Sequence, residues 1–476
     1  MIEHSTRIHQ NNSHLKQRTT MKNTFFYQFL ILAILVLANT APVNSQNIIY
    51  DGNHGGETSI IRNYTNGVDI VYTTSAGVYD RFHYIDRNTL SSQIIDISEP
   101  FAVQDFVIKG DTLFFCGIYF LNSSKSSSLP VYGYFNINDV FFSGGTIRYW
   151  TFSGSNSTGA VVSLTKMDVT KTSYGDIHLM MLGFGLYFDG NNYQSNLGAI
   201  VDVCINALGN HKAYSHVDTT HHFIFDDVTF TDKHVIVTAH EYAGLVSSLY
   251  NIFCYNYPTS VGNNIFDNTN TVVPFTAFPN RIHDNLPAPL PHSSHDVLVA
   301  NMTGGKFATL CYKSDATSTY ILSTYQTYQT YPFIQPIQRF IIPKFPSYKQ
   351  LIYNSKQQTF YVINCSDKIL SIKYPFLTTN TITTNNINHQ WLSIDNADRY
   401  THEMLSGRDH SLQLKLWQLD ESKFNSCATF TTDVNIETDL EEHPLQHGQP
   451  IDVRNCTSYS FNPSVNTTKI YIECSD

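Results

Sequence analysis

Asp105-Phe-Val-Ile-Lys-Gly-Asp-Thr-Leu-Phe-Phe-Cys-Gly117 aligns without a gap with Asp227-Val-Thr-Phe-Thr-Asp-Lys-His-Val-Ile-Val-Thr-Ala239 in the same chain. Each stretch contains an apolar-alternating strand, a tight turn and a second apolar strand. Seven units of this kind lie between Ser59 and Asp420. Internal similarity of this kind is typical of a repeat architecture in which each unit forms one supersecondary element.

The first unit shows how such a repeat is built. Ile60–Tyr64 and Val68–Thr73 flank Asn66-Gly67, and Asn-Gly is the strongest short signal for a β-hairpin. Val78–Ile85 and Ser92–Ile97 complete a meander of four strands. No segment of the mature chain keeps the 3.6-residue period of an amphipathic helix. Repeated four-stranded sheets without helices predict an all-β protein with the β-propeller architecture.

We therefore predict a β-propeller of seven or eight four-stranded blades. A pair of β-sandwiches is the alternative, but it requires a linker. The only linker-like stretch, Leu286–Pro291, interrupts no unit. Ile451–Phe461 and Lys469–Cys474 are expected to form one more hairpin, with Gln46–Tyr50 beside it. Strands from the two ends of the mature chain would then close the ring.

The predicted C-terminal hairpin carries the one disulfide that we expect among eight cysteines. A hairpin folded about Val465 places Cys456 opposite Cys474, and directly opposed residues have Cβ atoms about 4.5–5.5 Å apart. The other cysteines, such as Cys116 and Cys311, occupy strand positions where a small apolar side chain is sufficient.

The N-terminal residues have the pattern of an export signal. Lys22 precedes the apolar run Phe25–Leu37, and Val43-Asn44-Ser45 fits cleavage before Gln46. The run is shorter than the roughly 20 residues of a membrane span, although a retained signal anchor is the alternative. We predict an upstream extension over residues 1–20, with translation starting at Met21, then a signal peptide over 21–45 and a single propeller domain over 46–476. No transmembrane segment is expected in the mature chain.

Composition narrows the range of partners. Removal of residues 1–45 changes the formal charge from −10 to −13, which argues against nucleic acid and anionic membranes. Tyr and Phe are abundant, and charged residues are only 14% of the chain. A secreted, extracellular or cell-surface protein is expected, or a periplasmic one if the source is bacterial.

Catalytic and metal-binding motifs are absent from the sequence. There is no His-Glu-x-x-His, nucleophile elbow or phosphate-binding loop, so we expect neither a cofactor nor a metal. Asp105, Asp227 and Asp296 occupy matching places in first strands. Such acids could ring a central channel, but hydrogen bonding to backbone groups at a turn is the favoured interpretation.

Loop lengths indicate a place for binding. The predicted loops between second and third strands are long in three consecutive units, at Leu121–Pro130, Gly185–Asn196 and Glu241–Ser248. Loops on a rigid scaffold often carry function. The candidate binding residues there are Tyr187, Asn191, Tyr193, His240 and Tyr242, and Glu241 is the one candidate catalytic residue.

The chain resembles secreted β-propeller proteins in this repeated unit over nearly all of the mature sequence. Leu412–Asp420 is similar to the third strand of a WD40 blade, but the Gly-His element of those repeats is missing. The resemblance therefore transfers no functional residues. We expect a binding module that recognises a protein or a glycan. A carbohydrate-active hydrolase or lyase and a structural envelope component are the alternatives.

Overall fold

The computed structural model divides the chain into two compact units, and the residues that it describes belong to the unit Gln46–Cys474. They lie between 47 and 473. The longer gaps are at 52–58, 75–79, 153–159, 242–249, 258–279, 283–296 and 343–349, and across much of 396–468. Within these limits the strands form seven antiparallel sheets, each named here by its innermost strand.

Three sheets come from the first half of the chain. The β2 sheet contains β2 (Ser59–Thr65), β3 (Val68–Thr73), β4 (Asp80–Asp86) and β5 (Ser91–Ile97). The β6 sheet contains β6 (Phe101–Lys109), β7 (Thr112–Phe120), β8 (Ser128–Asn136), β9 (Thr146–Phe152) and β33 (Val453–Ser460). The β10 sheet contains β10 (Ala160–Lys171), β11 (Ile177–Phe188), β12 (Tyr193–Ile205), β13 (His211–Val217) and β32 (Gln449–Ile451). Helix α2 (Ile137–Phe142) connects β8 to β9.

Four more sheets follow in the same order. The β14 sheet contains β14 (Phe223–Phe230), β15 (His234–Glu241), β16 (Tyr250–Asn256), β17 (Asn280–Ile282) and β31 (Glu441–Glu442). The β18 sheet contains β18 (Leu298–Met302), β19 (Lys306–Lys313), β20 (Thr319–Thr327), β21 (Ile334–Ile342) and β30 (Asn435–Ile436). The β22 sheet contains β22 (Gln350–Asn354), β23 (Thr359–Ile363), β24 (Lys368–Lys373), β25 (Thr379–Thr384) and β29 (Ala428–Thr429). The β26 sheet contains β26 (Gln390–Asp395), β27 (Glu403–Arg408), β28 (Leu414–Leu419), β1 (Asn47–Asp51) and β34 (Lys469–Glu473).

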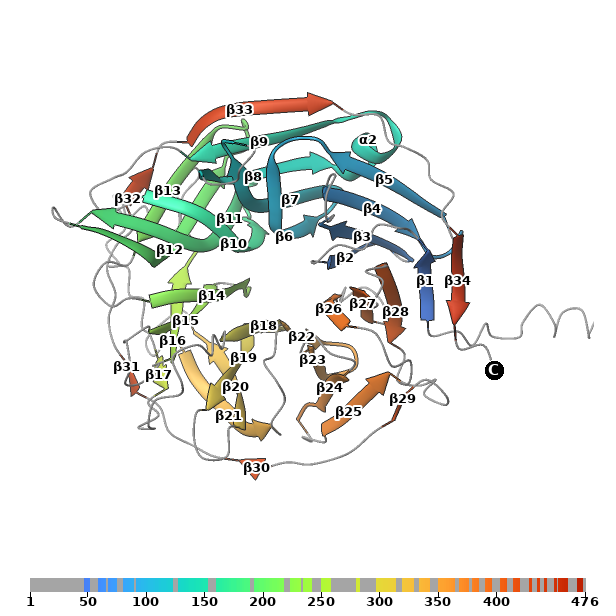
Figure 1. Cartoon of the computed structure of the whole chain (residues 1–476). Helices are drawn as coiled ribbons and strands as arrows, with labels where there is room; N and C mark the ends of the chain where they lie inside the picture. Colours follow the sequence, from blue (N-terminus) through green and yellow to red (C-terminus); the bar gives the residue numbers. More distant parts are fainter. Residues whose placement is uncertain are drawn as a thin grey trace, which may run out of the picture. The chain divides into compact units, whose positions relative to one another are not determined.

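The innermost strands form a closed circle. Each one contacts the innermost strand of the next sheet, and β26 contacts β2 to complete the ring (Figure 1). Apolar side chains fill the spaces between neighbouring sheets. Phe82, for example, packs against Phe106 across the β2–β6 boundary. Some strands are covered on both faces: every residue of β3 is buried, including the polar Asp69 and Thr73. The protein is an all-β propeller, as predicted.

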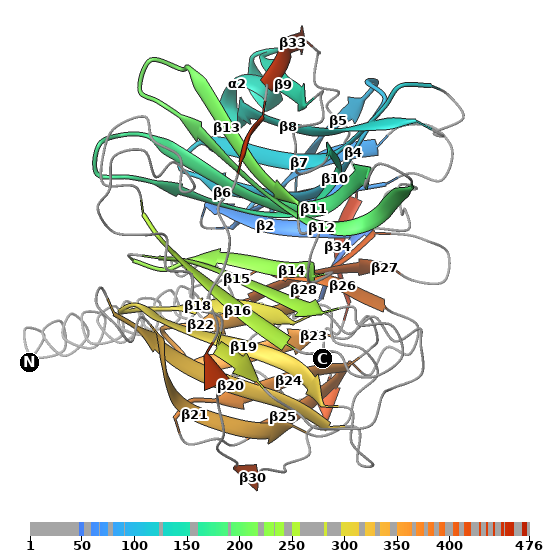
Figure 2. The same cartoon turned by 90° about the vertical axis from the view of Figure 1, so that its left-hand side faces the viewer.

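A C-terminal belt runs around the outside of this ring. After β28 the chain returns past the sheets in reverse order and adds β29, β30, β31, β32 and β33 as outermost strands. Figures 1 and 2 both place β30 and β33 on opposite sides of the ring. β34 is the outermost strand of the β26 sheet, so within the described residues only the β2 sheet lacks a C-terminal strand at its edge. The prediction of four-stranded blades is therefore wrong for the other six sheets.

The first and last described strands, β1 and β34, share one sheet, as expected for Gln46–Tyr50 and Lys469–Cys474, but the predicted C-terminal hairpin does not form. β1 lies between β28 and β34 and pairs with both. β33 pairs instead with β9, where Cys456 lies opposite Trp150. β34 and β33 thus belong to different sheets, so the cross-strand geometry that supported a Cys456–Cys474 bridge is absent. The position of Cys474 lies outside the described residues. The error arose because two neighbouring apolar strands usually pair with each other, whereas here each adds to an open sheet edge.

No helix in the described part of the chain is long and apolar enough to cross a membrane.

Candidate functional site

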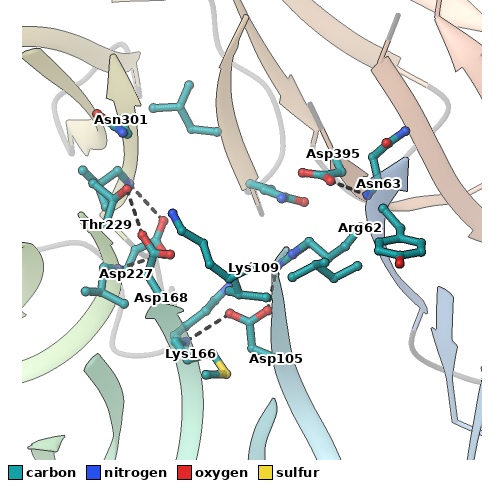
Figure 3. A pocket seen from close by; sticks show the side chains of 18 of the residues that line it. Arg62, Asn63, Asp105, Lys109, Lys166, Asp168, Asp227, Thr229, Asn301 and Asp395 are labelled. Carbon is teal, nitrogen blue, oxygen red and sulfur yellow. Dashed lines mark hydrogen bonds and ion pairs between the residues drawn. The ribbon is translucent and has the colours of Figure 1, made fainter. Parts of the chain in front are cut away.

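A cavity of about 480 Å³ opens at the centre of the ring. Every innermost strand contributes to its lining, and polar side chains dominate it (Figure 3). The charged lining residues are Arg62, Lys109, Lys166, Asp105, Asp168, Asp227 and Asp395. Such a volume lies within the range of about 300–1,000 Å³ that is typical of small-molecule sites. The cavity is therefore the best-defined candidate site in the described residues.

β-Bulges aim the acidic side chains at the cavity. The pairing of β6 with β7 shifts immediately before Asp105, and that of β14 with β15 shifts immediately before Asp227. In β10 the same shift precedes Lys166. A bulge turns the following side chain away from the regular alternation of a strand. Three successive innermost strands thus present an acid, a base and an acid at equivalent positions.

Glycine opposite the bulge makes this geometry possible. Gly117 faces Val103 just before the shift in β6, and Gly183 faces Leu164 in β10. A Cβ atom at Gly183 would lie 1.9 Å from the carbonyl oxygen of Ser163, and one at Gly117 would lie 2.0 Å from that of Ala102. No other residue fits such a close backbone approach. The β6 and β10 bulges therefore depend on these two glycines, whereas the β14 bulge faces Ala239.

The acids also join each sheet to the next. Asp105 Oδ2 accepts from the backbone N–H of Met167 at 3.1 Å, and Asp227 Oδ2 accepts from that of Val299 at 3.0 Å. Asp168 Oδ2 accepts from Phe230 N–H at 2.8 Å. Each carboxylate thereby satisfies a backbone group in the next innermost strand. Asp105 and Asp227 bind backbone N–H groups, but these groups lie within the neighbouring innermost strand and not at a turn, so that part of the favoured interpretation is wrong. Both acids also line the channel, as the alternative interpretation expected. Asp296 lies outside the described residues.

Asp105→Ala is expected to lower the free energy of unfolding by about 3 kcal/mol. The change leaves the Met167 N–H and the Arg62 guanidinium without their carboxylate, which lies 2.7 Å from Arg62 Nη2. Asp96→Ala is the control, because the Arg81–Asp96 pair is more exposed and should contribute less than about 1 kcal/mol. Urea denaturation measures both. Equal losses would contradict the proposed joining role.

Burial controls the ionisation of the acids in the wall. It raises the pKa of Asp227 to about 6, and the nearby Lys166 ammonium opposes this shift. Burial also raises the pKa of Asp168, while the N–H of Phe230 and the charge of Lys109 act in the opposite direction. Asp227 thus remains mostly ionised at neutral pH, and both carboxylates are less well solvated than surface acids. In the described residues, no group of three or more His, Cys, Asp or Glu side chains has the geometry of a metal site.

Of the binding residues predicted from loop length, the two whose side chains the structure describes, Tyr187 and His240, do not line this cavity. Tyr187 is half-buried in β11 and packs against the core between the β6 and β10 sheets. His240 is buried in β15, and its Nδ1 lies 2.9 Å from each oxygen of Asp226. Tyr193 lies in β12 and Glu241 lies in β15, and the structure describes only the backbone of these two residues. Asn191 and Tyr242 lie outside the described residues.

The predicted loop region and the cavity lie toward opposite ends of the innermost strands. Glu241 pairs with Phe223 at the start of β14, whereas the cavity residues Asp227 and Thr229 lie in its second half. Part of the predicted loop at 185–196 is strand, since Phe188 still pairs with Tyr193. Sequence reasoning missed Arg62, Lys109, Lys166, Asp168 and Asp395. The match of Asp105 with Asp227 in the repeat was the available signal. Other residues of the same innermost strands, such as Lys109, line the same cavity.

No family model matches this sequence, and no curated protein matches it. Among solved structures, the β-propeller domain of Cps50 (Swd1) from Myceliophteria thermophila is similar at 9% identity and a TM-score of 0.41, with 79% of this chain and 100% of that one covered. Drosophila Semaphorin 2a is similar at 10% identity and a TM-score of 0.41, covering 79% and 75%. A prolyl endopeptidase is similar at 9% identity and a TM-score of 0.42, and this chain, 85% of which is covered, spans about half (53%) of it. Likenesses this weak support no statement about function.

Proposed function

We propose that this protein is a secreted or surface-exposed binding module whose ligand, a protein or a glycan, binds in the central cavity described above. We call this cavity the channel mouth. The observation that carries the proposal is a difference between the acidic and basic side chains that line the cavity. Asp105, Asp168 and Asp227 are held by backbone N–H groups, whereas the exposed Lys109 extends into the space between Asp227 and Arg62 (Figure 3). A preorganised polar wall around an accessible cationic side chain suits recognition.

Lys109→Met is expected to weaken ligand binding at least about tenfold, which corresponds to about 1.4 kcal/mol, without changing the melting temperature. The ammonium group is removed while most of the aliphatic stem remains. Lys356→Met is the matched control, because Lys356 is an exposed lysine in the β22–β23 turn and does not line the cavity. Binding would be measured by titration with ligands found on glycan and peptide arrays. Equal affinities of the two variants would exclude the channel mouth as the site.

The region around the second-to-third-strand connections of the β6, β10 and β14 sheets is a second candidate for binding. The β11–β12 hairpin supports it, because the pair Phe188–Tyr193 extends beyond the first residue of β10, Ala160, which faces Leu186. A projecting hairpin offers backbone and side chains to a partner. Binding lost in Tyr193→Ala or Tyr242→Ala, but kept in Lys109→Met, would favour this region.

A carbohydrate-active hydrolase or lyase is the alternative function. The Asp226–His240 hydrogen bond supports it, because a carboxylate that orients an imidazole is a common part of acid–base catalysis. Glu241 follows His240 directly in β15. Product analysis on any glycan that binds, with Glu241→Gln for comparison, tests the idea. Turnover that disappears in this variant would support catalysis.

A further inference from the structure

The groups that face the channel mouth differ in how much hydrogen-bonding capacity remains to them. Arg62 donates to the carbonyl oxygens of Phe106 at 2.9 Å and Ile61 at 2.8 Å, and to Asp105. Asp105 accepts in addition from the N–H groups of Phe106 and Met167. The hydrogen bonds of Arg62 and Asp105 are therefore made within the protein, and this pair would contribute little to ligand binding.

Asp227 keeps more acceptor capacity than Asp105, whereas Asp168 already accepts from Val169 N–H, Thr229 Oγ1 and Phe230 N–H. Asp227 accepts from the N–H groups of Val228 at 3.0 Å and Val299 at 3.0 Å. An ionised carboxylate has about four acceptor sites, so two bonds leave room for further donors. Burial raises the pKa of Asp227 to about 6, which indicates that its charge is incompletely solvated. A ligand that donates hydrogen bonds would stabilise this carboxylate.

Donor groups stand beside these acceptors. Lys109 and Asn301 are both exposed and line the cavity, and an ammonium group has three donors. Lys109 lies close enough to Asp168 to lower the pKa of that acid, and Lys166 does the same to Asp227. Bases and acids therefore alternate around the mouth instead of separating into a positive and a negative side.

This alternation disfavours a ligand with a full charge of either sign. An anion that approaches Lys109 also meets Asp168 and Asp227, and a cation that approaches these acids also meets Lys109 and Lys166. Like charges brought together in a partly desolvated site cost several kcal/mol. A hydroxyl group avoids this repulsion, because it donates one hydrogen bond and can also accept two.

We propose that the channel mouth binds an uncharged, hydroxyl-rich ligand, namely the neutral sugar units of a glycan. The proposal rests on the proposed function, since it assumes that the channel mouth is the binding site. Sugar hydroxyls donate to Asp227 and accept from Lys109 and Asn301. Lys109 and Asn301 lie on β6 and β18, so a ligand that contacts both must span the cavity.

The test is a titration of the full mature chain with three probe classes: neutral oligosaccharides, oligosaccharides that carry uronic or sialic acids, and extended peptides. Lys109→Met and Asn301→Ala each remove donors from the mouth, and Lys356→Met leaves the mouth unchanged. Neutral oligosaccharides are expected to bind, and each of the first two variants should weaken that binding at least tenfold. Acidic oligosaccharides of the same backbone should bind no more tightly than neutral ones.

The outcomes separate an error in the ligand class from an error in the site. Tighter binding of acidic sugars or peptides, weakened in Lys109→Met, would overturn the neutral-sugar inference and leave the channel site in place. Binding of neutral sugars that is unchanged in Lys109→Met and Asn301→Ala but lost in Tyr193→Ala would overturn both. The absence of binding to all three probe classes would also overturn the inference. Thermal unfolding of each variant confirms that the fold is intact.

Discussion

Truncation after Asp452 is expected to abolish the cooperative unfolding transition of the protein. The cut removes β33, which lies along the whole of β9, and β34, which covers the outer edge of β1. β1 would then be held only by β28, and the ring would lose one side of its closure. The loss should exceed the roughly 5–15 kcal/mol that stabilises an ordinary domain. Far-UV circular dichroism during urea denaturation measures it.

A milder change in the same belt provides the control. Ile436→Pro affects only β30, which pairs with β21 over two residues, Asn435 and Ile436. Proline removes one backbone donor from this short strand, so an effect near 1 kcal/mol is expected. If the truncated chain unfolded at the same urea concentration as the intact chain, the belt would have no part in holding the ring closed.

Asp202→Asn is expected to destabilise the protein by about 3–5 kcal/mol at neutral pH, because it leaves a buried charge without its partner. The Nδ1 atom of His178 lies 3.3 Å from Asp202 Oδ1, and the two side chains are 1% and 0% exposed. Burial alone would lower the pKa of His178, but the Asp202 carboxylate outweighs it and raises the pKa from 6.5 to about 10. His178 is therefore protonated in the folded protein at neutral pH.

The same pair predicts a pH dependence with a definite sign. The folded-state pKa of His178 is higher than the unfolded value, so the pair contributes fully below pH about 6.5. This contribution is lost as the pH rises from about 6.5 through about 10. Urea midpoints measured over this window should fall in the parent protein and stay flatter in Asp202→Asn. The Asp96→Ala variant should follow the parent, and a parallel slope in Asp202→Asn would refute the ionised pair.

Much of the fold could be predicted from the sequence because each unit carries its own local signals. Asn66-Gly67 marks a hairpin turn, and Gly67 has φ +82°, the left-handed value that such turns require. The gapless match of Asp105 with Asp227 also holds, since both residues directly follow a bulge and both line the cavity. The hydrophobic alternation of strands and the residue types of turns are local properties, and the same signals occur in several units of the repeat.

The candidate site was predicted poorly because its residues come from different sheets and meet only when the ring has formed. Arg62 and Asp105 are 43 positions apart, and Asn63 and Asp395 are 332 apart. His240 looked like a loop residue with a polar role, yet it lies buried against Asp226. Loop length is a property of one hairpin, whereas the cavity is formed jointly by seven innermost strands. No single unit contains the information about it.

Hydrophobic alternation and turn residues act over a few positions, and they are therefore sufficient to specify a propeller of repeated antiparallel units. Two other features arise only when distant parts of the folded chain come together. The C-terminal belt depends on open sheet edges that accept β29 to β33, and strand pairing at an edge requires no particular side chains. The channel mouth depends on Lys166 standing between Asp105 and Asp227, a relation that exists only once the ring has closed.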